Sequence, residues 1–257
     1  MVSKVYILRT GFLILDKSMF TRTDNGIKQK CPVYCVLLQT EDGQNILIDT
    51  GQNPLGIKEP EKTWGTRHLE LPVVMTEEDD VRSRLAQIGL KPEDVTAVIN
   101  THLHWDHTGG NQFFPQAPFY VQKAEYRFAL YPDSFFRKSF LYNHFNVGVH
   151  YELKEGDFEL TEGVFVFDTS GHTPGHQSVL VTMTDGRKLI VTGDACYIPE
   201  NVNDLVLQGN CYDSCAAVRS LNKIRTIKML TGADLLPSHN PSPDFFTSLP
   251  DYIQTIG

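Results

Sequence analysis

The sequence predicts an α/β (α+β) protein in which two mixed β-sheets pack face to face with helices on the outside. Strand-like segments rich in Val, Ile and Leu recur along the chain, and each half also contains helical segments. This order fits two sheets, because each sheet must bury an apolar face against another layer. The chain has 257 residues, is 41% hydrophobic and contains no Pro/Gly/Ser-rich linker, so we expect a single domain over residues 1–257.

The N-terminal half opens with strands. Turn residues such as Asp42-Gly43 separate these strands and predict an antiparallel start. A helix is expected after Thr76, a possible N-cap, because acidic residues follow it and apolar residues then recur at helical spacing. The elements expected in this half are strands Val5–Leu15, Val33–Gln39 and Asn45–Asp49, the helix carrying Val81, Leu85 and Ile88 and ending at Gly89, strands Val95–Ile99 and Phe119–Val121, and a short helix Lys123–Leu130.

The C-terminal half resumes the strand pattern after Gly156. The pair Asp185-Gly186 is typical of a hairpin turn, so the strands on either side of it are expected to be antiparallel. A long helix is expected from Ser214 to about Leu230. The strands expected in this half are Val164–Asp168, Ser178–Thr182, Lys188–Thr192 and, as the last, Asp234–Pro237.

Four potential metal ligands lie within six residues, directly after a predicted strand. The run contains His102, His104, Asp106 and His107. Residues two apart in an extended segment point the same way, so the first two can hold one ion, and a turn at Thr108-Gly109-Gly110 directs the other two at a second. Imidazole and carboxylate suit borderline ions such as zinc. A solvated polar loop is the alternative, but three of only nine histidines gather here.

Four residues cannot complete the coordination of two ions, so later strand ends are expected to contribute. His172, Asp194 and His239 each stand as a polar residue at the end of an apolar run. Taken singly, each is more often a hydrogen-bonded structural residue than a ligand. Asp49, in Asp49-Thr50-Gly51 at the end of the third strand, is expected to orient the metal-site loops rather than bind metal.

The pattern His-x-His-x-Asp-His, then Gly-His-x-Pro-Gly-His, an Asp after a strand and a C-terminal His resembles the metallo-β-lactamase superfamily over nearly the whole chain. The resemblance implies a four-layer αββα sandwich with a binuclear metal site. It implies that one metal is bound by His102, His104 and His172, that the other is bound by Asp106, His107 and His239, and that Asp194 bridges them. The remaining histidines are expected to be structural or at the surface, namely His176, His68, His144 and His150.

Two differences from known branches of this superfamily narrow the range of expected activities. The β-lactamases proper lack the full Asp-His pair or place a cysteine where this chain has Asp194, and flavodiiron-type relatives replace His104 with Glu and add a flavodoxin-like domain. Antibiotic hydrolysis and electron transfer are therefore not expected. Four short sequence segments instead resemble those of N-acyl homoserine lactonases and related lactonases such as pyridoxolactonase. They are Gly171–Ser178, Asp194–Tyr197 and, more weakly, Cys31–Tyr34 and Met75–Asp79.

The resemblance implies a hydrolase acting on ester bonds, most of all the lactone ring of N-acyl homoserine lactones, and hence quorum quenching. Two divalent ions lower the pKa of a bridging water to about 7, and the resulting hydroxide attacks the carbonyl. Tyr197 is expected to donate a hydrogen bond to the developing oxyanion, a contact typically worth about 3 kcal/mol. Asp106 is expected to pass a proton to the departing alkoxide. For Tyr197, packing beside the site without a catalytic role is the alternative.

The amino-acid composition limits the kinds of molecule that the chain is expected to bind and the compartment in which it is expected to work. The net charge of −8 argues against nucleic acid, since such binding depends on Lys and Arg, and favours a small-molecule lactone or ester substrate. Charged residues interrupt the apolar N-terminus, so no signal peptide or membrane span is expected. Five cysteines without a CxxC pair suit the reducing cytoplasm. Zinc is the expected metal, with iron, manganese and cobalt as alternatives, and a homodimer is the family expectation.

Two other functions compete with the lactonase. A glyoxalase II-like thioesterase shares the His-x-His-x-Asp-His ligands, but the chain lacks an obvious basic C-terminal region for a glutathione-like anion. A metal-binding or regulatory protein without turnover is the alternative outside enzymes, and the complete ligand set argues against it. The long segments 52–74 and 131–151 are expected either to cover an acyl chain or to form a dimer interface or helix core.

Overall fold

The computed structural model describes residues 1–257, and its strands form two sheets. The strands are β1 (Val2–Asp16), β2 (Lys28–Thr40), β3 (Asn45–Ile48), β4 (Val73–Val74), β5 (Ala97–Ile99), β6 (Pro118–Gln122), β7 (His150–Lys154), β8 (Phe158–Thr161), β9 (Val164–Asp168), β10 (Gln177–Thr182), β11 (Lys188–Val191), β12 (Asp234–Leu236) and β13 (Ile253–Ile256). The first sheet runs β13-β1-β2-β3-β5-β6-β7, with β4 also paired to β1, and the second runs β12-β11-β10-β9-β8. Both sheets contain parallel and antiparallel pairs.

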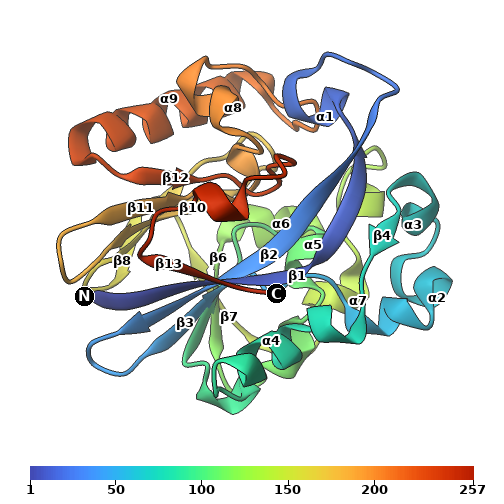
Figure 1. The fold of residues 1–257 in the computed structure, drawn as a ribbon. Helices are drawn as coiled ribbons and strands as arrows, with labels where there is room; N and C mark the ends of the chain where they lie inside the picture. Colours follow the sequence, from blue (N-terminus) through green and yellow to red (C-terminus); the bar gives the residue numbers. More distant parts are fainter.

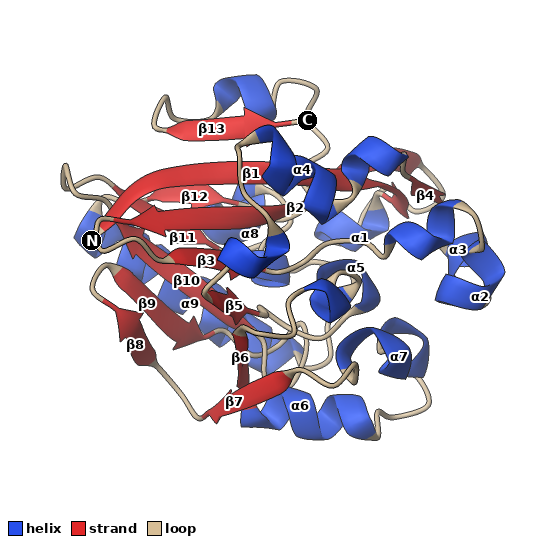
Figure 2. Cartoon of the chain, turned by 90° about the horizontal axis from the view of Figure 1, so that it is seen from below, coloured by secondary structure: helices blue, strands red, loops and turns tan.

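Helices lie on the outer sides of the two sheets (Figure 1). They are α1 (Ser18–Thr21), α2 (Pro60–Trp64), α3 (Arg67–Glu70), α4 (Val81–Gln87), α5 (Trp105–Thr108), α6 (Lys123–Leu130), α7 (Tyr142–Phe145), α8 (Pro199–Asn203) and α9 (Ser214–Thr231). α9 lies over the second sheet and α4 lies on the opposite side of the molecule, against the first sheet (Figure 1). α2, α3 and β4 group together at the end away from α9, as Figure 2 also shows.

Period-two alternation sends successive side chains of the first sheet into different layers. On β1, Val5 and Ile7 enter the core between the two sheets, whereas Tyr6 and Leu8 face the α4 side. The inter-sheet core also takes Val166 and other residues of β9 to β12. Each residue of this core is less than 9% exposed, so the two sheets are joined by one continuous apolar layer.

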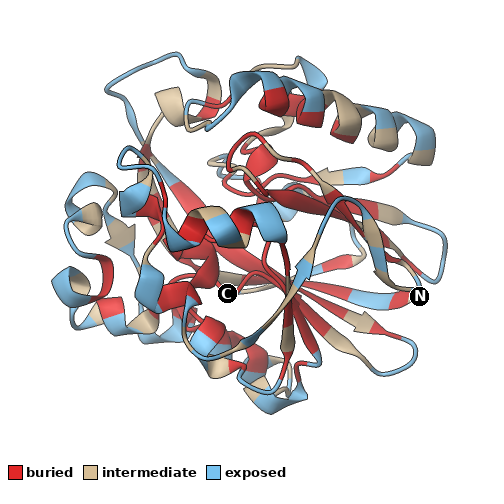
Figure 3. Ribbon diagram, turned by 180° about the vertical axis from the view of Figure 1, so that it is seen from behind, coloured by how far each residue is buried: buried red, intermediate tan, exposed pale blue.

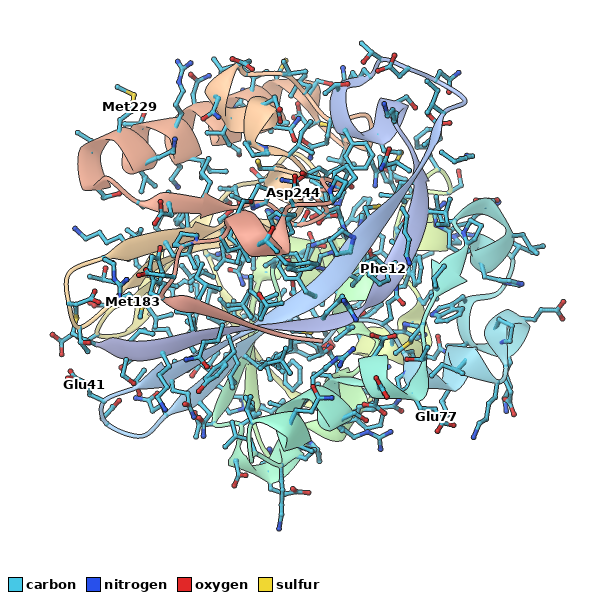
Figure 4. The ribbon with its side chains drawn as sticks, in the orientation of Figure 1. Phe12, Glu41, Glu77, Met183, Met229 and Asp244 are labelled. Carbon is cyan, nitrogen blue, oxygen red and sulfur yellow. The ribbon has the colours of Figure 1, made fainter.

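The long helix α9 buries one face and exposes the other (Figure 3). Asp213 caps the start of α9, because its carboxylate accepts hydrogen bonds from the N–H groups of Cys215 and Ala216. Gly232 caps its end in the left-handed conformation at φ +69°. Its Leu221 and Ile224 pack on the second sheet, while Met229 is 78% exposed and points away from it (Figure 4). None of the helices combines the length and apolar composition needed to cross a bilayer.

The two-sheet prediction is confirmed, as are the antiparallel opening and the hairpin at Asp185-Gly186. The helix expected after Thr76 is wrong in its start. Asp79 folds its carboxylate back to the Thr76 N–H and closes a separate turn, after which Asp80 caps α4. The strand at 234–237 is not the last one, because the chain returns to β1 as β13.

Candidate metal centre

Four loops deliver the predicted ligands to one edge of the sandwich. The histidine run follows β5, His172 lies between β9 and β10, Asp194 follows β11, and His239 follows β12. All seven side chains belong to buried residues. The sequence-predicted residues are thus brought together without exception: His102, His104, Asp106, His107, His172, Asp194 and His239.

The turn within the histidine run differs from the expected one. We expected Thr108-Gly109-Gly110 to redirect the chain, but the redirection is made earlier by α5 itself. Helical geometry places Asp106 and His107 on the first turn, after the extended His104. Gly109 is still required, because a Cβ there would lie 2.2 Å from the backbone nitrogen of Asn53.

The donor atoms fall into two groups. One contains His102, His104, His172 and Asp194, and the other contains Asp106, His107 and His239, with the donor atoms of each group within 4.8 Å of one another. In the first group, Nε2 of His172 lies 3.0 Å from Nδ1 of His104. Such separations suit atoms that share a central cation.

The Asp194 carboxylate faces both groups. Its Oδ1 lies 3.2 Å from Nε2 of His107 and 3.3 Å from Nε2 of His239. Its Oδ2 lies 3.3 Å from Nε2 of His172 and 3.8 Å from Nε2 of His102. One oxygen is therefore directed at each group.

The chemistry of these donors fits divalent cations. Nε2 of His102, Nε2 of His107 and Oδ1 of Asp194 are buried without a hydrogen-bond partner. A buried polar atom without a partner costs about 1–3 kcal/mol, so a cluster of them is stable only if a ligand satisfies them. A cation held by imidazole and carboxylate does so.

Charge is distributed unequally between the two groups. Burial lowers the pKa of His102, His104 and His172, which favours the neutral imidazole that metals require. Burial opposes protonation at His107 too, but the negative charges of Asp194 and Asp106 outweigh it and raise the pKa of His107. The second group therefore attracts positive charge, whether a proton or a metal ion.

Each ring has an outer hydrogen bond that fixes its direction. Nδ1 of His172 lies 2.8 Å from the carbonyl oxygen of Asn210, and Nδ1 of His239 lies 2.8 Å from that of Pro32. These Nδ1 atoms carry the proton and donate it, so the opposite nitrogen faces the cluster with its lone pair. These two carbonyl partners could not be predicted from the sequence.

Asp49 has the orienting role predicted for it. Its Oδ2 lies 2.8 Å from Nδ1 of His107 and also accepts a hydrogen bond from the Thr101 hydroxyl. Its Oδ1 accepts from the Thr101 N–H at 2.7 Å. Asp49 therefore connects the end of β3 to the loop after β5 and stands outside both donor groups.

Glu125 is a supporting residue that the sequence reasoning missed. This fully buried carboxylate on α6 accepts hydrogen bonds from the Leu103 N–H and the Gly175 N–H, each at 3.0 Å. It thus joins the histidine run to the turn that carries His172. Burial raises the pKa of Glu125 to about 7. An isolated Glu in a short helix has no signal that distinguishes it from a surface residue.

Comparison with known proteins agrees with this arrangement. The family profile described as Metallo-beta-lactamase superfamily matches residues 29–239. The chain belongs to this superfamily. Two similar relatives are each called N-acyl homoserine lactonase: one from Bacillus cereus, 36% identical over 230 residues, and one from a Bacillus species, 37% identical over 232 residues. In both comparisons 89% of each chain is covered.

A solved structure shows the same likeness. It is an N-acyl homoserine lactone hydrolase with its product, N-hexanoyl-L-homoserine, bound at the catalytic metal centre. It superimposes with a TM-score of 0.85 at 29% identity and covers 97% of each chain. The metallo-β-lactamase fold inferred from the sequence motifs is thereby confirmed.

Tyr197 stands beside the donors of this member of the metallo-β-lactamase superfamily. The side chain is buried, and its ring centre is 5.2 Å from that of His239 and 6.0 Å from that of His172. Burial, reinforced by the charges of Asp194 and Asp106, raises the pKa of its phenol well above the ordinary value. The hydroxyl therefore stays protonated and able to donate.

A small cavity adjoins the donors and Tyr197. One wall is apolar and comes from β1, α1 and the chain after α3: Leu13, Leu15, Met19 and Leu71. The rest of its lining includes Arg67 and Ser139, one from each of the two long segments. Phe140 also packs on His104, with ring centres 4.7 Å apart. The segments 52–74 and 131–151 thus both border the donor cluster.

The other histidines lie outside the donor groups, as predicted. Nδ1 of His176 lies 2.9 Å from the Thr169 hydroxyl. His144 is buried between the carbonyl oxygens of Trp105 and Thr63, where it connects α7 to α5 and α2. His68 and His150 are not buried.

Proposed function

We propose that this chain is a binuclear metal-dependent lactonase that opens the ester ring of N-acyl homoserine lactones. The observation that carries the proposal is the buried donor cluster with Tyr197 beside it, in a chain whose relatives bear the name of this activity. No observation favours the thioesterase over it.

In this proposal His102, His104 and His172 would hold one metal ion, Asp106, His107 and His239 would hold the other, and Asp194 would bridge the two. The direction of one Asp194 oxygen toward each group supports the bridge. Zinc is the proposed metal, because imidazole and carboxylate in this proportion are typical zinc ligands.

Bound ions supply a Lewis acid for the ester carbonyl and lower the pKa of a water molecule. The chain's own groups complete the reaction. Tyr197 donates a hydrogen bond to the carbonyl oxygen as negative charge develops on it, a contact of about 3 kcal/mol. The Asp106 carboxylate, 3.6 Å from Nε2 of His239, accepts the proton that the attacking water loses and passes it to the ring oxygen that departs as the ester C–O bond breaks.

The cavity wall determines what fits beside this centre. Leu13, Leu15 and Leu71 offer an apolar surface next to the catalytic groups. An acyl chain gains about 25 cal/mol per Å² of apolar surface that leaves water, so this wall favours substrates with a hydrocarbon arm.

The test begins with protein purified without chelator, whose metals are counted by elemental analysis. Hydrolysis is then measured on acyl-homoserine lactones, a simple aliphatic lactone and a glutathione thioester. About two metals per chain with clear lactone turnover is the expected result. Turnover of the thioester alone would keep the site and overturn the substrate, and a single metal with full activity would overturn the binuclear assignment.

A further inference from the structure

One positively charged side chain lines the cavity beside the donors. Arg67, at the start of α3, lines the cavity together with the donors His104 and Asp106, and its side chain is only 17% exposed. The lining of the same cavity includes apolar residues, among them Leu13 and Leu71. An arginine so placed is desolvated, which is costly unless its donors are used.

Two contacts fix the guanidinium plane. Nη1 donates to the Glu70 carboxylate at 3.1 Å, and Nη2 donates to the Ser139 hydroxyl at 3.3 Å. Glu70 also pairs with Lys138, so the long segments 52–74 and 131–151 are joined at this point. The arginine is therefore held from both segments and cannot turn freely toward other partners.

The third nitrogen of the guanidinium group remains without a partner. Nε of Arg67 is buried and has no hydrogen-bond partner in the protein. Leaving a buried donor unsatisfied costs about 1–3 kcal/mol, and an oxygen acceptor supplied by a bound molecule recovers this free energy. Because the plane is fixed by Glu70 and Ser139, the direction of this N–H is fixed too.

We propose that Arg67 is a specificity-determining residue whose Nε–H group binds a carbonyl oxygen on the acyl-amide arm of the substrate. This rests on the proposed lactonase function. The ester carbonyl reacts at the metal donors, so the oxygen available to Arg67 is a second one, the amide carbonyl or an oxo group farther along the chain. The carboxylate of Glu70 already balances the arginine charge, which favours a neutral carbonyl over an additional anion.

The proposal is tested with metal-loaded wild type and Arg67→Met on three lactones with a five-membered ring and arms of similar length. They are N-hexanoyl homoserine lactone, N-(3-oxohexanoyl) homoserine lactone and a γ-alkyl butyrolactone, which has no second carbonyl. In the variant, kcat/KM should fall about tenfold more for the acyl homoserine lactones than for the alkyl lactone, mainly through KM. If the extra loss of kcat/KM is the same for the two acyl substrates, the oxygen that Arg67 binds is the amide carbonyl. If the loss is larger for the 3-oxo compound, it is the oxo group of the chain.

Two further variants separate recognition from folding. Arg67→Lys keeps the charge but not the fork geometry, so it should lose the same substrate preference while thermal unfolding and metal content stay at wild-type values. Arg187→Met, at the hairpin between β10 and β11, removes an exposed arginine paired with Asp185 and should leave the preference intact.

An equal loss on all three lactones, or no loss in either Arg67 variant, would overturn the inference and leave the lactonase standing. If the fully metallated wild type hydrolyses none of the three, the proposed function itself fails and the inference fails with it.

Discussion

The donor cluster and the cavity wall are built differently, although they touch. The seven donors follow strands of both sheets, and all are buried. The wall comes partly from short helices and turns whose neighbouring residues are open to water, with Leu69 71% and Phe135 88% exposed. The donors thus follow strand ends, whereas part of the cavity lining stands on surface segments that can vary without moving the donors.

The strongest test of the donor cluster is Asp194→Asn. This change keeps the shape of the side chain but removes the negative charge that faces His107 and His172. We expect turnover to fall to background and the metal content to fall as well, measured by elemental analysis and lactone hydrolysis. A variant that retained both metals and activity would show that the cluster does not depend on this carboxylate.

Tyr197→Phe tests whether the hydroxyl group beside the donor cluster takes part in the reaction. Loss of the hydroxyl should lower kcat by about 10²-fold, the usual cost of one oxyanion donor, without changing the metal content. Steady-state kinetics and elemental analysis on the same preparation check this. Full turnover in the variant would remove Tyr197 from the mechanism and leave it as a packing residue.

Asp49→Asn tests the support behind the cluster. The carboxylate holds Nδ1 of His107 at 2.8 Å, and loss of such an outer partner typically costs about 10–100-fold in metal affinity or activity. Competition with a chelator measures the affinity. Asp16→Asn serves as the control, because that carboxylate binds the turn around Ser18 and Gly26, pairs with Lys28 and lies outside both donor groups. Equal affinities in both variants would contradict the orienting role.

Glu125→Gln tests the link between the two histidine loops through pH. Burial raises the pKa of Glu125 to about 7 from an ordinary 4.5, so the folded state holds this proton more tightly than the unfolded state. The stability from this group is present below about pH 4.5 and is lost as the pH rises through about 7. Gln does not titrate. Urea unfolding of both metal-free proteins at pH 5 and 8 should therefore show a larger fall in wild type, whereas parallel falls would contradict the shift.

The smallest effect on stability and activity is expected for a substitution on the exposed surface of α3. Leu69→Ser changes a side chain that is 71% exposed, so the free energy of unfolding should move by no more than about 0.5 kcal/mol. The kcat/KM for lactones of short and long acyl chain should keep its ratio. A changed ratio would mean that substrates reach past the cavity lining to the surface of α3.

The meeting of the seven side chains was predictable because they follow strands, and strands show clear patterns in the sequence. His102 and His172 both follow segments whose apolar composition marks the preceding strand. Arg67 and Glu125 were not predictable, since their importance depends on burial by segments distant in the chain. β13 was missed for a similar reason, because only its pairing with β1 distinguishes residues 253–256 from a loop.

The return of the chain to β1 also covers a sheet edge that could otherwise pair with a second copy of the chain. β1 is 15 residues long and pairs with β2 along one side. On the other side, β13 occupies Val5 to Leu8 and β4 occupies Phe12 and Leu13. Without these two short strands, a long apolar edge would offer free N–H and C=O groups to another copy of the chain, the arrangement from which aggregates grow.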